Sequence, residues 1–347
     1  MAIADITVLG AGIFGLSIAW VAHQRGARVK VIEAQSIGAG SSGGLVGALA
    51  PHTPENWNSK KQFQFESLIL AESFWQSVSK ASGLDPGYAR SGRIQIIQDE
   101  RGLELANARA ESAVSLWQGA AAWRVVSQAE FTDWAPLSAT GLLIHDTLSA
   151  LLHPRLAIQS LVHALRLGGA EIIEGDAEPE GIVIEATGEA GLRELSNAFG
   201  KQVGNGVKGQ AAAFQFNAVG KPQLFLDGLH IIPHRNGTTA IGSTSERDYD
   251  NDQDTDHQLE DLIEKARRLC PALAESPVID RWAGIRPRAK SRAPMLGHHP
   301  LREERLIANG GFKIGFGMAP KVAEVMVDLA LEGRDTIPAE FKVEASL

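Results

Sequence analysis

Apolar and polar positions follow two different rhythms in the first part of the chain. Residues 5–9 form a short apolar run, as in a buried strand, and residues 28–33 form another. Between them, residues 13–23 carry apolar positions at helical spacing. Because the connections are very short, the pattern predicts a β-α-β unit. A loop of small residues, GAGSSGGLVGALAP, follows from Gly38 to Pro51.

The middle of the chain continues this alternation of helix and strand. A helix is expected at residues 154–167, because Pro154 suits its first turn and Gly168-Gly169 ends the pattern. The other elements predicted in this part are helices at 62–80 and 103–119 and strands at 93–98, 171–174 and 181–185.

The last third mixes β-rich and helical segments. Residues 223–243 predict a strand, a turn at Asn236-Gly237 and a second strand. Nucleotide-type α/β signals thus occur at the start, middle and end of the chain with β-rich material between them, which favours two interleaved domains. The remaining elements expected are a helix at 259–269, a strand at 305–309, a glycine-rich turn at 310–320 and a helix at 321–331.

A dinucleotide fingerprint lies at the junction of the first strand and helix. Gly10, Gly12 and Gly15 form G-x-G-x-x-G, in which the glycines permit a tight turn, a close pyrophosphate and close helix packing. The helix N-terminus offers free N–H groups to the phosphates. Glu33 ends the second strand, where an acid can accept hydrogen bonds from ribose hydroxyls and disfavours a 2′-phosphate, so NADP is not expected.

Two further signals favour FAD over NAD, which stays open as the rival cofactor. The small residues from Gly38 to Ala50 can lie against a flat, extended cofactor. Deep in the chain, the strand IVIE is followed by Ala186, Thr187 and Gly188, a feature of flavoproteins whose chain returns to the FAD domain.

Composition narrows the functional class. The net charge of −8 gives no support for nucleic-acid binding. Cys270 is the only cysteine, so no internal disulfide and no cysteine metal cluster can form, and we expect it to be a core residue. No run is apolar enough to span a membrane, and no secretory signal precedes the first strand. The expected location is cytoplasmic, and we expect no bound metal.

The chain resembles the D-amino-acid oxidase-type family of FAD-dependent oxidoreductases, and within it glycine oxidase and sarcosine oxidase most. The resemblance covers nearly the whole chain. The matching pieces are, in chain order, GAGIFG with Glu33, SSGGLVGALAPH, HPRLAIQSLVHAL, IVIEATG, KGQ, LHIIPHRNGTTAIGSTSE, RWAGIRP and GGFKIGFGMAPKVAEVMVDL. The last three of these are the most specific to the family.

The resemblance implies an α/β fold, α+β overall. A discontinuous Rossmann-like FAD-binding domain of the glutathione-reductase type would be interleaved with a substrate domain rich in β-sheet. The expected ranges are 1–52, 140–213 and 283–347 for the FAD-binding domain and 53–139 and 214–282 for the substrate domain.

The same resemblance implies which residues hold a non-covalent FAD. Covalent attachment through cysteine is not expected, because Cys270 lies far from the relevant motif. Residues at the glycine turn and Glu33 would hold the ADP half, the small-residue loop the pyrophosphate and flavin, and the 311–315 loop the pyrimidine edge. The expected set is Gly10, Gly12, Ile13, Phe14, Gly15, Glu33, Ala34, Ser41, Ser42, Gly47, Leu49, Ala177, Ala186, Thr187, Gly188, Gly311, Phe312, Lys313, Ile314 and Gly315.

On the substrate side, Arg286 of RWAGIRP matches the family arginine that grips the substrate carboxylate. His230 takes the place of a family tyrosine, which leaves the identity of the substrate open. Lys313 resembles the lysine that helps to bind the carboxylate in sarcosine oxidases. His52 follows the flavin loop and would line the entrance. Arg288, Lys290 and Arg292 follow Arg286 closely and are expected to form a solvated basic loop, although one of them could meet a second acidic group on the substrate.

These features predict FAD-dependent oxidation of an amino acid or related amine by hydride transfer from the α-carbon to flavin N5, giving an imine. The partners would be this small substrate and oxygen or another electron acceptor, with a homo-oligomer possible. Two alternatives stay open: a flavin domain like that of tRNA-modifying amine oxidases, and an FAD-holding electron-transfer subunit of a larger complex.

Overall fold

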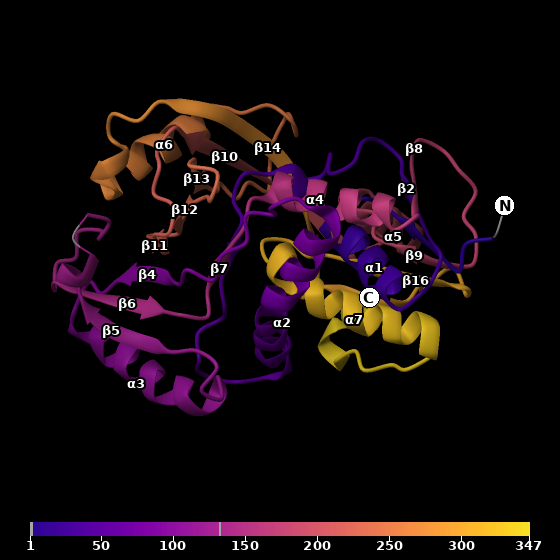
Figure 1. Cartoon of the computed structure of the whole chain (residues 1–347), viewed down its shortest axis with the longest axis horizontal. Helices are drawn as coiled ribbons and strands as arrows, with labels where there is room; N and C mark the ends of the chain where they lie inside the picture. Colours follow the sequence, from indigo (N-terminus) through magenta and orange to yellow (C-terminus); the bar gives the residue numbers. More distant parts are fainter. Residues whose placement is uncertain (1–2, 132) are drawn as a thin grey trace.

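The computed structural model describes residues 3–131 and 133–347. These residues form two large sheets that lie side by side, with helices α2 (Ser59–Ser82) and α4 (Pro154–Leu167) near the middle of the molecule (Figure 1). A sheet of mainly parallel strands lies on the right of this view and a mixed sheet on the left.

The six-stranded sheet has the order β15-β16-β9-β1-β2-β8. All neighbours pair in parallel except β15 and β16, which are antiparallel. Parallel sheets are covered on both faces, and the central strand β1 is accordingly buried along most of its length. The bounds are β1 (Ile6–Leu9), β2 (Val29–Glu33), β8 (Glu171–Glu174), β9 (Ile182–Glu185), β15 (Met295–His298) and β16 (Arg305–Asn309).

Helices α1 (Ile13–Gln24), α5 (Gly188–Phe199) and α7 (Gly315–Glu332) pack with this sheet. Helix α1 is buried from Ile13 through Ala22, because α4 and α7 pack against it on different sides. A helix enclosed on several sides is apolar all round, which is why α1 carries so few polar residues. The β-α-β unit predicted at the start of the chain is confirmed.

The eight-stranded sheet has the order β14-β10-β13-β12-β11-β4-β6-β5. Its pairs are antiparallel except β11 with β4. A small sheet of β3 (Ala48–Leu49) and β7 (Ala150–Leu151) accompanies it. The bounds are β4 (Arg93–Ile96), β5 (Trp123–Ser127), β6 (Leu142–Asp146), β10 (Gly204–Phe214), β11 (Gln223–Leu226), β12 (Leu229–Pro233), β13 (Thr239–Gly242) and β14 (Val278–Ala289).

Two helices accompany this sheet. Helix α6 (His257–Leu269) buries Leu259, Ile263 and Ala266 against one face, in a core shared with Phe214 and Ile231. Helix α3 (Glu100–Leu116) packs on the edge strand β5. The opposite face of the sheet is left for the rest of the molecule, and the substrate residues lie there.

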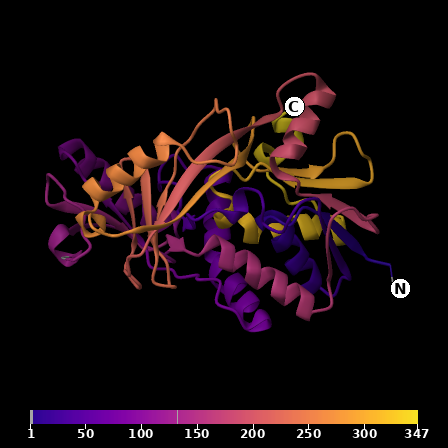
Figure 2. The same cartoon turned by 90° about the horizontal axis from the view of Figure 1, so that it is seen from above.

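Strands β10 and β14 pair over most of their length and connect the two halves of the molecule. Figure 2 shows these long strands extending from the eight-stranded sheet toward α5, which packs against both. Of the ranges predicted for the FAD-binding domain, 140–213 includes β6 and most of β10. Both strands belong to the eight-stranded sheet and not to the six-stranded one. The predicted domain ranges remain a proposal.

Three sequence predictions need correction. Helix α7 begins at Gly315, not at Lys321, since the glycines and Pro320 that suggest a turn are held in the helix by burial of Met318 and Ala319. Residues 223–243 contain three strands, because Asp227-Gly228 makes a second tight turn with positive φ at both residues. Helix α5 and strands β3, β5, β6, β7, β10, β14 and β15 were not predicted.

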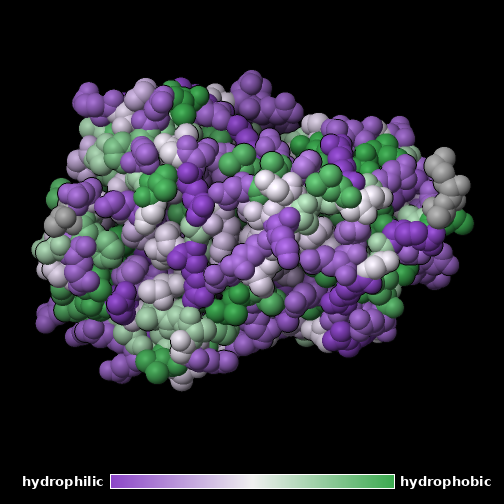
Figure 3. All heavy atoms as spheres, viewed as in Figure 1, coloured by the Kyte–Doolittle hydropathy of each residue, from purple (hydrophilic) through white to green (hydrophobic). Residues whose placement is uncertain are grey.

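On the face shown in Figure 3, hydrophilic side chains are interspersed with scattered hydrophobic ones. Among the described residues, no helix combines the length and the apolar character that crossing a bilayer requires.

Candidate functional site

The glycine turn has the geometry that the fingerprint predicts. Gly10 has φ of 104°, and a side-chain carbon there would lie 2.5 Å from the carbonyl oxygen of Ala186. A side-chain carbon at Gly15 would lie only 2.0 Å from the Gly10 carbonyl oxygen. No other residue fits at either position, because only glycine brings the two backbones this close. Gly12 precedes α1 and provides no side-chain cap.

Three helix N-termini meet at one edge of the six-stranded sheet. Strands β1, β9 and β16 are parallel neighbours, so their carboxyl ends lie together, and α1, α5 and α7 start just beyond these ends. Neither Thr187 before α5 nor Ile314 before α7 makes a side-chain capping hydrogen bond. Free N–H groups and the positive ends of three helix dipoles therefore converge where a phosphate-bearing or anionic ligand would bind.

The 311–315 loop lies directly on the glycine turn. A side-chain carbon at Gly311 would come within 2.9 Å of the ring of Phe14, at the start of α1. Asn309 donates from Nδ2 to the Gly188 carbonyl at 2.8 Å and so ties the ends of β16 and β9 together. The structure thus brings the first, middle and last pieces of the predicted cofactor site to one place.

Glu33 ends β2 beside this edge. Its carboxylate accepts hydrogen bonds from the backbone N–H of Ala11 at 2.7 Å and of Gln35 at 3.0 Å. Ala34 is exposed next to it, and half-buried Ala177 lies in the 175–181 loop that follows the adjacent strand β8. That loop contains no strand.

The small-residue loop approaches the glycine turn from the other side. Buried Ser42 accepts a hydrogen bond at Oγ from the N–H of Ile13 at 3.0 Å, whereas Ser41 is only half-buried. A side-chain carbon at Gly47 would meet the Leu152 carbonyl oxygen at 1.9 Å. Leu49 is fully buried in the core near α7, so its side chain does not face a cavity.

These residues fit FAD. The glycine turn leaves room for a pyrophosphate on a helix N-terminus, and Glu33 stands at the ribose position of the fingerprint. Uncapped α7 adds a positive dipole end within the same row, where negative charge on a reduced flavin would be stabilised. Which of the predicted residues contact the cofactor remains part of our proposal.

The inner face of the eight-stranded sheet provides the substrate side. Small residues occupy adjacent strands there: Gly284 pairs with Gly209, and Ala211 pairs with Gly242. Larger side chains rise around this floor from the same face, because directly paired residues point to the same side. The clamp candidate Arg286 lies at one end of the floor. His230, which pairs with Gly242, borders the floor from strand β12.

Arg286 is buried, with 7% of its surface exposed, and its guanidinium lies over Gly209. A side-chain carbon at Gly209 would be 1.8 Å from Nη1 of Arg286, so glycine is required below the clamp. Nη1 donates to the Thr244 carbonyl at 3.2 Å. Burial lowers the pKa of Arg286 to about 10, and nearby Glu246 opposes the change. The guanidinium thus stays charged at neutral pH.

Lys313 and His230 belong to the same electrostatic neighbourhood as Arg286. Burial, Arg286 and Arg288 lower the pKa of Lys313, although its side chain keeps access to solvent. Burial, Arg93 and Lys313 lower the pKa of His230 to about 3. His230 is therefore neutral at physiological pH, and its Nδ1 has no hydrogen-bond partner among the described residues.

Sequence reasoning missed several polar residues that surround Arg286 and His230. Arg93 forms a buried ion pair with Asp146 at 2.9 Å and lies 5.8 Å from the ring centre of Phe225, which packs on His230. Glu246, below the clamp, accepts a hydrogen bond from Gln210 at 3.0 Å. The alternating pattern of RIQI placed Arg93 on one strand face, but only the strand order brings that face to His230.

His52 is not drawn into this cluster. It is exposed, its Nδ1 bonds to the side chain of Gln64, and the charges that act on it are Lys60 and Lys61. Among the described residues no contact joins His52 to the clamp, so its predicted place at the entrance remains untested.

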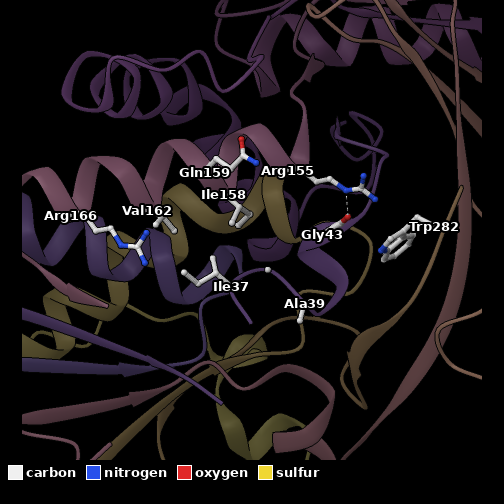
Figure 4. Close-up of a pocket in the computed structure, with 10 residues that line it drawn as sticks. Ile37, Ala39, Gly43, Arg155, Ile158, Gln159, Val162, Arg166 and Trp282 are labelled. Carbon is white, nitrogen blue, oxygen red and sulfur yellow. Dashed lines mark hydrogen bonds between the residues drawn. The ribbon is translucent and has the colours of Figure 1, made fainter. Parts of the chain in front are cut away.

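A separate cavity of about 530 Å³ lies between the 37–43 loop and one face of α4 (Figure 4). Ile158 and Val162 line it from α4 with Arg155 and Arg166 at its two ends, and Trp282 closes one side. Arg155 is already engaged, because it donates to the Gly43 carbonyl at 2.8 Å and pairs with Asp280 at 2.6 Å. None of the predicted site residues lines this cavity.

Two chemical alternatives find no support in the described part of the chain. It contains no group of three or more His, Cys, Asp or Glu side chains arranged to hold a metal ion. Cys270 is a core residue, as predicted, and burial raises the pKa of its thiol to about 11, so it is not a reactive thiolate.

Comparison with known proteins agrees with this site. Glycine oxidase of Bacillus licheniformis is 24% identical, over 94% of this chain and 93% of the relative. The crystal structure of glycine oxidase from Geobacillus kaustophilus superposes with a TM-score of 0.83 at 20% identity, covering 98% of each chain. That of iminodiacetate oxidase from Chelativorans sp. BNC1 gives 0.82 at 18% identity, covering 96% and 97%.

These structures show that the fold is the predicted α/β one, with a mainly parallel sheet and a second β-rich sheet. The family model for FAD dependent oxidoreductases of the D-amino-acid oxidase type matches residues 5–329, nearly the whole chain. The cofactor is thus FAD and not NAD, and the chain belongs to the D-amino-acid oxidase-type family of FAD-dependent oxidoreductases.

Proposed function

We propose that this protein oxidises an amino acid or a related amine and that Arg286 binds the substrate carboxylate. The observation that carries the proposal is a buried arginine with no carboxylate at ion-pair distance among the described residues, lying on a floor of small residues. A guanidinium is the natural bidentate receptor for a carboxylate. A buried charge without a partner destabilises the protein, so binding of an anion beside Arg286 should lower the free energy of the site.

When bound, FAD would supply the oxidation, taking a hydride from the substrate α-carbon at N5 so that the amine becomes an imine. The chain's part is to hold the substrate: Arg286 would fix the carboxylate above the floor formed by Gly209, Ala211, Gly242 and Gly284. Orientation of this kind accounts for much of the rate gain in such reactions. Water would hydrolyse the released imine to a keto acid and ammonia or, where the substrate is a secondary amine, to a keto acid and the corresponding primary amine.

His230 contributes polarity without charge in this proposal. Its neutral ring carries one donor and one acceptor nitrogen, and Nδ1 has no partner among the described residues, so it is available to a polar group of the substrate. Lys313 supplies positive charge beside the flavin or the carboxylate. The glycine turn, Glu33 and the 311–315 loop hold FAD, and oxygen or another acceptor removes the electrons. We also propose a cytoplasmic location, in keeping with the single, buried, free cysteine.

The test is anaerobic reduction of the bound flavin, followed as bleaching of its absorbance. The panel consists of glycine, sarcosine, D- and L-amino acids and secondary amines. We expect at least one amino acid to bleach the flavin. If none does, the amino-acid proposal is wrong, and the role of an FAD-holding electron-transfer subunit takes its place.

Arg286→Leu tests the clamp. We expect a rise in the apparent substrate constant of about 100-fold or more, since a charge-assisted pair contributes roughly 3 kcal/mol. FAD content should stay the same, because Arg286 lies on the other sheet from the glycine turn. Unchanged kinetics would remove Arg286 from the site.

A further inference from the structure

Three cationic side chains gather at one end of the substrate face. Arg286 and Arg288 are two residues apart on β14, so both point to the same side of the sheet. Arg288 also forms a backbone bridge with Gly311, which brings the strand against the flavin loop. The guanidinium of Arg288 lies 5.4 Å, and Nζ of Lys313 5.7 Å, from the ring centre of Phe312. The loop thus presents its own cation beside that of the strand.

The position of Arg288 is built into the fold. Phe312 has φ of 44°, in the left-handed region, and its N–H donates to the carbonyl of Pro287 at 2.9 Å. This bond and the Arg288–Gly311 bridge hold the Phe312 ring where Arg288 packs on it. Arg288 is half-buried, unlike exposed Arg292, which lies beyond the end of the same strand. A freely solvated arginine would need none of these contacts.

None of the three cations has an ion-pair partner among the described residues. Other basic residues near the same strand do: Arg281 pairs with Glu260 at 3.1 Å, and Arg155 pairs with Asp280 at 2.6 Å. Glu246 attracts Arg286, but it is already 3.8 Å from Lys208 and accepts hydrogen bonds from neighbouring side chains. The positive charges at the clamp therefore exceed the negative charges that face them.

A charge count indicates what would balance this cluster. One substrate carboxylate matches Arg286, and negative charge on the reduced flavin matches Lys313. One cation, Arg288, remains without a counter-charge in a partly buried position, where an unpaired charge is costly. An acceptor group on the substrate would remove this cost and gain a charge-assisted hydrogen bond.

We propose that the substrate carries two carboxylates, one bound by Arg286 and the second by Arg288. This inference rests on the proposed function and narrows its substrate class to dicarboxylic amino acids or N-carboxymethyl amines. Arg288 is then a specificity-determining residue: it selects the two-acid substrate and is not needed for holding FAD or the first carboxylate.

The experiment measures binding of substrate-like acids that cannot be oxidised. FAD-loaded protein is titrated with acetate and with malonate, succinate and glutarate. Binding is followed by perturbation of the flavin spectrum and, independently, by the rise in thermal unfolding temperature. We expect at least one diacid to bind 10-fold or more tightly than acetate.

Two matched variants decide the role of Arg288. Arg288→Gln should reduce the diacid-to-acetate ratio to near one and change acetate binding less than twofold. Arg292→Gln removes the same charge from an exposed neighbour and should leave the ratio unchanged. Arg288→Lys, which keeps the charge, should preserve part of the preference and serves if the glutamine variant does not fold.

The inference is overturned if no diacid binds more tightly than acetate. It is also overturned if the preference survives in Arg288→Gln or falls equally in Arg292→Gln. The proposed function fails separately, through acetate itself: if Arg286→Leu binds acetate as well as the unchanged protein does, the clamp is wrong whatever the diacid ratio shows.

Discussion

The two sides of the site are built in different ways. On the cofactor side, backbone does most of the work: glycines at positions 10 and 15 remove side chains, and three helix ends present their N–H groups. On the substrate side, side chains cover a floor of small residues, and Arg286 and His230 come from strands separated by β10 and β13.

The difference shows what each side can tolerate. The cofactor side depends on distances near 2 Å that no side chain can enter, so changes there are severe. On the substrate side, the nearest neighbours of the floor glycines are side chains, which can move more easily than backbone, so changes there should alter selectivity more than folding. The following variants test this contrast in order of expected effect.

The largest effect is expected from Gly15→Ala. The added carbon would overlap the Gly10 carbonyl oxygen at 2.0 Å and force the first turn of α1 away from β1. We expect loss of FAD and destabilisation of roughly 3 kcal/mol or more, measured by flavin content and urea unfolding. Gly40→Ala is the control, since nothing lies within 4 Å of a side-chain carbon there. Equal FAD content in both variants would contradict the backbone role of Gly15.

Gly209→Ala should damage the substrate side alone. Its side-chain carbon would occupy the place of the Arg286 guanidinium, 1.8 Å from Nη1, and push the clamp aside. We expect KM to rise about 10- to 100-fold, as for loss of one charged hydrogen bond, with FAD content unchanged. Steady-state kinetics with the best substrate measure this. A loss of FAD instead would show that the two sides are not separable at this residue.

His234 makes the protein sensitive to acid. Burial and nearby His153 lower its pKa to about 4, whereas the unfolded chain should protonate it near its ordinary value of about 6.5. The unfolded state then binds more protons between these values, so stability falls as pH falls from 6.5 toward 4.

His234→Gln should remove this part of the acid sensitivity. The contribution between pH 7 and pH 5 is about 2 kcal/mol by linkage. The measurement is urea unfolding of wild type and variant at both pH values, where the variant should lose less stability. A variant that loses as much as wild type would show that His234 is not held neutral in the folded protein.

Glu246→Gln should have the smallest effect. The charge of Glu246 raises the pKa of Arg286, so its loss should let burial lower that pKa further. Arg286 would then lose its proton, and with it the substrate carboxylate, at a less alkaline pH than in wild type. The alkaline limb of a kcat/KM profile should move by less than about one pH unit, with neutral-pH activity nearly unchanged. Asp256→Asn is the control, because Asp256 bonds Gln210 and Lys208 but does not act on Arg286. Equal profiles for both variants would dissociate Glu246 from the clamp.

The cofactor side could be predicted from the sequence because its signals are local. Gly10, Gly12 and Gly15 lie within one turn between a strand and a helix, and Glu33 ends the next strand, so spacing alone fixes their arrangement. The predicted start of α7 was wrong because a local pattern was trusted there too. Gly317 and Pro320 are typical turn residues, and only packing against α1 and α2 keeps them in the helix.

The substrate side could be predicted only in part. Arg286, Lys313 and His230 came from the family resemblance, and in the structure Lys313 lies close enough to influence the pKa of His230 and to be influenced by Arg286. The Arg93–Asp146 pair and the Gly209 floor were missed, because their places depend on strand order and register between segments far apart in the chain. Nothing in a local pattern specifies such register.

The position of β16 and α7 has a consequence for biosynthesis. Strand β16 pairs with β9 inside the six-stranded sheet, and α7 packs on α1, although both come from the last fifty residues of the chain. During translation the glycine turn leaves the ribosome early but lacks this neighbour until synthesis is almost complete. A nascent or truncated chain should therefore remain colourless, and flavin capture should mark the moment at which the C-terminus is released.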